Sequence, residues 1–141
     1  MSGMTIPPLR KILCVDDEPL VQAIARAALE KRGGFTVLVC ASGAEALAAV
    51  PAFAPDLLLL DVMMPDLDGP ATLAALRRLP ATAATPVIFM TTRMQARELA
   101  PGAAPGIIGV VDKPFDPKTF AETVRTLWTR SHGGDAADDK R

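Results

Sequence analysis

The chain has 141 residues, of which 50% are hydrophobic and 22% charged, and this length suits a single domain around one core. Its formal net charge of -1 excludes a bulk electrostatic attraction to nucleic acid or to an anionic membrane surface. The apolar runs are far shorter than a membrane span, and residues 1–9 have no apolar core of the signal-peptide type. We therefore expect a cytoplasmic protein without a membrane partner.

The first part of the chain alternates short apolar runs with a helical pattern. Residues 1–9 are expected to be a flexible leader, and residues 11–15 predict a strand that ends at the acidic run Asp16-Asp17-Glu18-Pro19. A second strand is predicted over residues 35–40. Between them, helical spacing predicts a buried helix face made of Leu20, Val21, Ile24, Ala25, Ala28 and Leu29.

The two cysteines fall inside these two predicted strands. Cys14 lies in the first apolar run and Cys40 in the second. Cysteines in such a setting are ordinarily small buried hydrophobic residues of a reducing compartment, so we do not expect a disulfide or a metal pair.

A helix and a third strand are predicted in the middle of the chain. Ser42 and Glu45 have the spacing of a capping box, which predicts a helix that Pro51 and Pro55 stop. Four consecutive leucines at 57–60 predict a strand buried on both faces. Asp61 stands where this apolar run ends; an isolated aspartate there is ordinarily a cap of the next helix.

The second half of the chain continues the alternation. Pro70 suits the first turn of a helix, and segments 86–91 and 107–111 predict the fourth and fifth strands. Prolines and glycines between these strands indicate that the fourth helix is short or irregular. Residues 132–141 are small and polar and are expected to be a disordered tail. The last helix before that tail has a buried stripe of Phe120, Val124, Leu127 and Trp128.

This order of elements predicts an α/β fold. Strands that alternate with helices imply a doubly wound, five-stranded parallel sheet with helices on both faces. Right-handed crossovers leave few topologies, and we expect the flavodoxin-like strand order 2-1-3-4-5 in one domain over residues 10–131. In that order the first and third strands are neighbours, and all five strands end at the same edge.

Polar side chains gather at that edge. Asp16 and Asp17 follow the first strand, Asp61 ends the third, Thr91 ends the fourth and Lys113 follows the fifth. Each of them alone has an ordinary interpretation, such as a helix-start acid or a surface charge, but their joint placement favours a functional site. Converging carboxylates repel one another unless a cation neutralises them, and oxygen ligands suit Mg²⁺, with Mn²⁺ as an alternative. A carboxylate, a hard cation, a lysine and a hydroxyl together indicate phosphoryl transfer.

Three motifs, found together and in order, carry a resemblance to a known family. They are Val15-Asp16-Asp17-Glu18-Pro19, Leu60-Asp61-Val62-Met63-Met64-Pro65-Asp66-Leu67-Asp68-Gly69 and Lys113-Pro114-Phe115. With them the chain resembles the receiver domain of two-component response regulators over residues 10–130. The resemblance implies a signalling phosphoacceptor rather than a conventional enzyme, with a histidine kinase or a histidine phosphotransfer protein as the phosphoryl donor and a downstream protein as the target.

The resemblance also implies a role for each residue of the site. Asp61 would be the phosphoacceptor, Asp16 and Asp17 the acid pocket, Thr91 the switch hydroxyl and Lys113 a contact of the phosphoryl group. Mg²⁺ would be held by these acids together with the backbone carbonyl of Met63, with Asp17 and Asp61 as its carboxylate ligands.

Two positions depart from the family pattern. Val110 stands where the family usually has an aromatic residue, and Thr92 stands where a small residue usually follows the switch hydroxyl. A valine has no ring to bury on activation, so we expect intact phosphorylation but unconventional signalling, through the first helix and the loop around Lys113. Met63 and Arg93 lie where family members tune the lifetime of the acyl phosphate, and both side chains are large enough to shield it from water.

Several alternatives remain beside this interpretation. A Mg²⁺-dependent phosphohydrolase of the haloacid dehalogenase type needs a second aspartate where this chain has Met63, and so lacks its proton donor. A nucleotide or flavin binder needs a glycine-rich loop where the acidic run stands. With no helix-turn-helix pattern and no basic patch, we expect no direct contact with nucleic acid. The chain is either a small complete regulator, as the starting Met1 suggests, or the receiver part of a longer protein.

Overall fold

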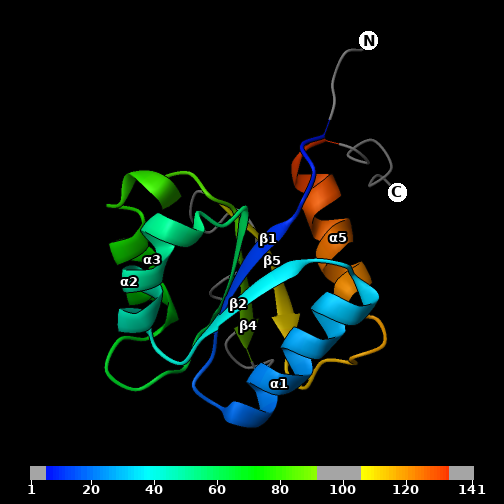
Figure 1. The fold of residues 1–141 in the computed structure, drawn as a ribbon, viewed down its shortest axis with the longest axis horizontal. Coiled ribbons are helices and arrows are strands. Elements are labelled where there is room, and N and C mark those ends of the chain that lie inside the picture. The colour runs from blue at the N-terminus through cyan, green and yellow to red at the C-terminus, as the bar shows by residue number, and fades with distance from the viewer. Residues whose placement is uncertain (1–5, 92–105, 134–141) are drawn as a thin grey trace.

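The computed structural model describes residues 6–91 and 106–133, and within them it contains one five-stranded parallel sheet (Figure 1). The strand order is β2-β1-β3-β4-β5, which confirms the predicted flavodoxin-like topology. Every neighbouring pair is parallel, so the carboxyl ends of all strands lie at one edge. The strands are β1 (Lys11–Val15), β2 (Thr36–Cys40), β3 (Leu57–Asp61), β4 (Val87–Thr91) and β5 (Ile107–Asp112).

Helices cover both faces of this sheet. In Figure 1, α2 and α3 lie on one side of the strands, and α1 and α5 lie on the other. No helix among the described residues is long and apolar enough to cross a membrane. The predicted short or irregular fourth helix falls between residues 92 and 105, outside the described residues. The helices are α1 (Pro19–Ala27), continued by the π-helical η1 (Ala28–Arg32), α2 (Gly43–Phe53), α3 (Gly69–Leu76), the 3₁₀ turn η2 (Pro80–Thr82) and α5 (Phe120–Ser131).

The sheet separates two hydrophobic cores. Alternate residues of a strand point to opposite faces, so Leu57 and Leu59 of β3 join the core under α1 and α5, while Leu58 and Leu60 join the core under α2 and α3. This explains why the four leucines form an uninterrupted apolar run. Cys14 belongs to the first core and Cys40 to the second, and both are buried free thiols, as predicted.

Two details of the helices differ from the sequence-based predictions. Leu20 is 71% exposed, because it lies in the first turn of α1 and the first fully buried side chain of this helix is that of Ala25. The second helix starts at the predicted cap, where Ser42 Oγ accepts the N–H of Glu45 at 3.1 Å. It does not stop at Pro51 but runs through it to Phe53, since a proline in the last turn removes only one N–H donor close to the helix end.

Residues near both ends of the described chain pack together. Ile6 and Leu9 contact the core under α5, and Trp128 Nε1 donates to the carbonyl of Pro7 at 2.9 Å. His132 follows Trp128 by one turn, and the two rings lie 4.4 Å apart. Part of the predicted leader and the first residue of the predicted tail therefore have defined contacts, while residues 1–5 and 134–141 lie outside the described residues.

Candidate functional site

The acidic residues predicted from the sequence converge at the carboxyl edge of the sheet. Asp16 follows β1 directly, and its N–H still donates to Cys40 O of β2 at 3.1 Å. Asp61 is the last residue of β3, the strand next to β1. One carboxylate oxygen from each of Asp16, Asp17 and Asp61 lies within 4.8 Å of the others. The distance between these groups is short enough for a single small cation to contact them.

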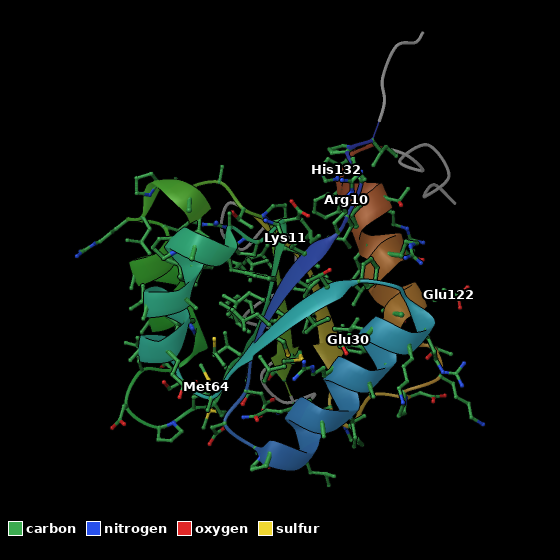
Figure 2. All side chains as sticks on the ribbon, in the orientation of Figure 1. Arg10, Lys11, Glu30, Met64, Glu122 and His132 are labelled. Carbon is green, nitrogen blue, oxygen red and sulfur yellow. The ribbon has the colours of Figure 1, made fainter. Side chains whose placement is uncertain are left out.

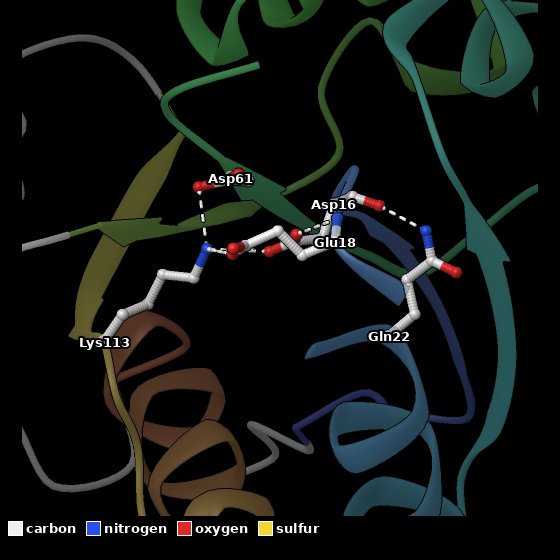
Figure 3. Close-up of polar contacts among 5 residues, drawn as sticks. All are labelled: Asp16, Glu18, Gln22, Asp61 and Lys113. Carbon is white, nitrogen blue, oxygen red and sulfur yellow. Dashed lines mark hydrogen bonds and ion pairs between the residues drawn. The ribbon is translucent and has the colours of Figure 1, made fainter. Parts of the chain in front are cut away.

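Lys113, which follows β5, forms ion pairs with two members of this acidic cluster (Figure 3). Its Nζ lies 2.9 Å from Asp16 Oδ2 and 3.2 Å from Asp61 Oδ1. A third carboxylate, that of Glu18, lies 3.4 Å away at the rim, with 62% of its side chain exposed. The contacts with Asp16 and Asp61 are buried and the third is not, so we expect the first two to dominate the electrostatics.

Asp16 is fully enclosed, and each of its polar groups has a partner in the protein. Besides the N–H bond to β2, Asp16 Oδ1 accepts the N–H of Glu18 at 2.9 Å, and Oδ2 accepts from Lys113. Its backbone carbonyl accepts from Gln22 Nε2 at 2.6 Å. By contrast, no hydrogen bond or ion pair from the described part of the chain holds the Asp17 carboxylate, which is half-buried. Asp17 is therefore more available to a cation than Asp16.

The surroundings of Asp61 disfavour its charged form. Burial, followed by the nearby charge of Asp16, raises the pKa of Asp61 from 3.8 to about 6, although Lys113 acts in the opposite direction. Burial by itself lowers the pKa of Lys113. The hydrogen bond and the charge of Asp16, together with the charge of Asp61, outweigh burial and raise the Lys113 pKa above its ordinary value.

This donor set fits Mg²⁺. The three carboxylates lie close together, and Lys113 contacts two of them, Asp16 and Asp61. The ionised cluster therefore carries an excess of negative charge, which contributes to the raised pKa of Asp61. A divalent cation would remove that excess. The side-chain donors are oxygens only, and Asp17 and Asp61 are both within reach of one ion.

The loop after β3 is shaped around Asp61. Gly69 N donates to Val62 O at 2.9 Å, and a Cβ at residue 69 would collide with the carbonyl oxygen of Asp61. Asp68 caps α3 by accepting the N–H of Ala71 at 2.9 Å. The side chain of Met63, at the start of this loop, is 63% exposed. A glycine is therefore required where the start of α3 passes the phosphoacceptor candidate.

Thr91 and Lys113 are linked through the backbone. Thr91 is buried at the end of β4, one residue beyond Met90, which pairs with Asp61. The carbonyl of Thr91 accepts the N–H of Lys113 at 2.8 Å, so β4 fixes the start of the segment that carries the lysine. Val110 is half-buried on β5 and pairs with Phe89. Thr92 and Arg93 lie outside the described residues.

Two residues of this neighbourhood were not assigned a role from the sequence. The sequence places Glu18 only in the acidic motif and predicts no role for Gln22, yet they contact Lys113 and Asp16 respectively. The position of Gln22 one turn into α1, near the acidic pair, was the only available signal. A helical glutamine is too common for that signal to be used.

Comparisons with known proteins agree with this geometry. The family described as response regulator receiver domain matches residues 12–125. Response regulator Rre1 of Synechocystis sp. is 35% identical over 126 residues, which are 89% of this chain and 54% of that protein. The transcriptional regulatory protein CpxR of Escherichia coli is 38% identical over 124 residues, which are 88% of this chain and 51% of CpxR. The chain thus spans about half the length of these two relatives.

A solved structure shows the same fold. The chemotaxis response regulator CheY4 of Vibrio cholerae superposes with a TM-score of 0.74 at 30% identity, covering 85% of this chain and 99% of CheY4. The family match takes in β1, β3 and β5, whose ends carry the acids and the lysine. The chain therefore belongs to the response regulator receiver domains of two-component signalling systems.

Proposed function

We propose that this receiver domain accepts a phosphoryl group on Asp61. The observation that carries the proposal is the position of one nearly enclosed carboxylate beside Asp17 and within 3.2 Å of Lys113, at the edge where the strands end. The donor is a phosphohistidine of a histidine kinase or of a histidine phosphotransfer protein. The cytoplasm is the compartment in which we expect the reaction to occur.

In the transfer step an oxygen of Asp61 attacks phosphorus, and a P–O bond forms while the P–N bond to the donor histidine breaks. The electron pair of the broken bond returns to the imidazole nitrogen, which takes up a proton. Lys113, already between Asp16 and Asp61, lies where it can donate to the incoming phosphoryl oxygens. Thr91 is proposed as the switch hydroxyl, and hydrolysis of the acyl phosphate by water completes the cycle.

Mg²⁺ would be held by Asp17, Asp61 and the backbone carbonyl of Met63, with Asp16 nearby, and Mn²⁺ is an alternative. When bound, the ion offsets charge on the phosphoryl oxygens. Asp16 would contribute its negative charge from beside the ion, because both of its carboxylate oxygens already accept hydrogen bonds, from Glu18 N–H and from Lys113. The same acids would keep out a phosphodonor in the absence of the cation, since like charges repel.

Signalling is proposed to use protein contacts beside the site. A groove of about 460 Å³ lies between α1 and the segment after β5, and Lys113 is part of its wall. The lining of this groove is mostly apolar. Outside it, Leu20 and Met63 are the large exposed apolar side chains of the described residues. A partner that reads the state of Lys113 could do so here without an aromatic residue at position 110. The groove is lined by Glu18, Val21, Ile24, Lys113, Pro114, Phe115 and Pro117.

The proposal is tested by incubation with Mg²⁺ and acetyl phosphate, followed by intact-mass measurement. The wild type is expected to gain the mass of one phosphoryl group, and Asp61→Asn is expected to gain none. Asp66→Asn is the matched control, since Asp66 is an exposed carboxylate in the same loop and should leave the modification intact. An unmodified wild type, or a modified Asp61→Asn, would contradict the proposal.

A further inference from the structure

The Asp17 carboxylate is positioned by backbone groups on either side of it. As no side-chain partner from residues 6–91 or 106–133 holds it, its direction depends on the two peptide groups that flank it. The peptide group after Asp17 is held because Glu18 N–H donates to Asp16 Oδ1 at 2.9 Å. The peptide group before Asp17 is held through the carbonyl oxygen of Asp16.

That carbonyl is held from α1. Gln22 Nε2 donates to it at 2.6 Å, and Figure 3 shows the amide reaching from the helix to the Asp16 backbone. Because a peptide group is planar, holding its oxygen also fixes the direction in which the next Cα leaves it. Gln22 is therefore coupled to Asp17 through one rigid peptide plane.

The side chain of Gln22 is not required for the packing of its helix. The buried anchors of α1 and η1 are Ala25, Ala28 and Leu29, one to two turns further along the chain. The backbone N–H of Gln22 makes an ordinary helical bond to Glu18 O at 3.0 Å. The amide thus acts on the turn between β1 and α1 rather than on the attachment of the helix.

We infer that Gln22 is a positioning residue for Mg²⁺, whose amide holds the Asp16–Asp17 peptide so that the Asp17 carboxylate faces Asp61. This inference rests on the proposed function, because it concerns the same Mg²⁺ site. Groups that orient metal ligands through hydrogen bonds commonly contribute about tenfold or more to metal affinity. Gln22 is the group that supplies this bond to the Asp16 carbonyl.

The test is titration calorimetry with Mg²⁺ alone on the wild type and on Gln22→Met, which keeps the side-chain length but cannot donate. The expected result is a Kd about tenfold higher in Gln22→Met. With acetyl phosphate, the Mg²⁺ concentration that gives the half-maximal rate should rise by the same factor, while the rate at saturating Mg²⁺ stays at the wild-type level. Ala23→Met, at the adjacent exposed position of α1, is the control and should leave the Kd unchanged.

A second variant separates positioning from simple electrostatics. Gln22→Glu adds a negative charge, which by charge alone would tighten Mg²⁺ binding, but its ionised carboxylate cannot donate to the Asp16 carbonyl. Weaker binding in both variants supports the inference. A wild-type Kd in Gln22→Met, or tighter binding in Gln22→Glu, overturns it. If the wild type itself binds no Mg²⁺, the proposed function fails first, and that result is distinguishable from either of these.

Discussion

Asp61 should destabilise the metal-free protein at neutral pH, so that Asp61→Asn is more stable than the wild type. The enclosed carboxylate has a pKa of about 6, against an ordinary value of 3.8, and this net effect already includes the attraction of Lys113. A difference of that size corresponds to roughly 3 kcal/mol at most, by which the ionised form weakens the folded state. Neutral asparagine avoids this cost.

The stability of the wild type should depend on pH, because the pKa of Asp61 differs between the folded and the unfolded protein. The folded protein binds the Asp61 proton more tightly than the unfolded chain does, so wild-type stability gains from this group as the pH falls through about 6. The gain is complete below the unfolded pKa of 3.8. The stability advantage of Asp61→Asn should therefore be largest above about pH 7 and should shrink steadily towards about pH 5.

Mg²⁺ should remove most of the stability difference between the two proteins. A ligand at about one hundred times its Kd adds roughly 2.7 kcal/mol to the stability of a protein that binds it in the folded state only. The wild type should receive this gain, and Asp61→Asn, which lacks one of the carboxylates, should receive much less. Saturating Mg²⁺ is thus expected to cancel most of the advantage of the variant.

The assay is urea unfolding followed by circular dichroism, with EDTA or with Mg²⁺, over the pH range above. Glu122→Gln removes an exposed carboxylate of α5 and should change the stability by less than about 0.5 kcal/mol under all conditions. The electrostatic reasoning is refuted if Asp61→Asn is the less stable protein in EDTA at neutral pH. It is also refuted if the advantage is independent of pH.

Three further substitutions probe other parts of the same framework. Lys113→Met removes the cation between Asp16 and Asp61 and should cost about 3 kcal/mol in EDTA by urea unfolding, with partial recovery on addition of Mg²⁺; an unchanged stability would contradict the buried ion pairs. Gly69→Ala places a Cβ against the Asp61 carbonyl and should cost about 1 to 3 kcal/mol and slow phosphorylation by acetyl phosphate; wild-type behaviour in both assays would show that the loop yields without strain. Ser42→Ala removes the cap of α2 and should lower the unfolding free energy by about 1 kcal/mol without affecting phosphorylation, whereas a slower reaction would link α2 to the site.

The sheet and its acidic edge could be predicted because their signals are local and strong. The four leucines before Asp61 form a run that is typical of a strand buried on both faces, and parallel topology then brings Asp16 next to Asp61. The signal at Lys113 was also local, since the lysine follows β5 immediately. These inferences needed no knowledge of side-chain direction.

The remaining features depend on how the helices are rotated and where they end. Leu20 fits the apolar spacing of α1 but lies in its first turn, ahead of the positions that pack on the sheet. Pro51 is tolerated because only two residues of α2 follow it, so the helix ends soon after the one hydrogen bond that the proline removes. The hydrogen bond from Gln22 to the Asp16 carbonyl depends on the turn between the two residues, and no residue pattern predicts it.

The contact of Trp128 with Pro7 determines what optical spectroscopy can observe in this protein. The chain has one tryptophan and no tyrosine, and its indole sits beside the residues that precede β1. Figure 2 shows His132 and Arg10 together at that end of the molecule and Met64 of the β3–α3 loop towards the other. Tryptophan fluorescence should thus change when the amino-terminal segment detaches and when the protein unfolds, but should not change when Mg²⁺ binds. An indole introduced in place of the exposed Met63 would supply the missing reporter.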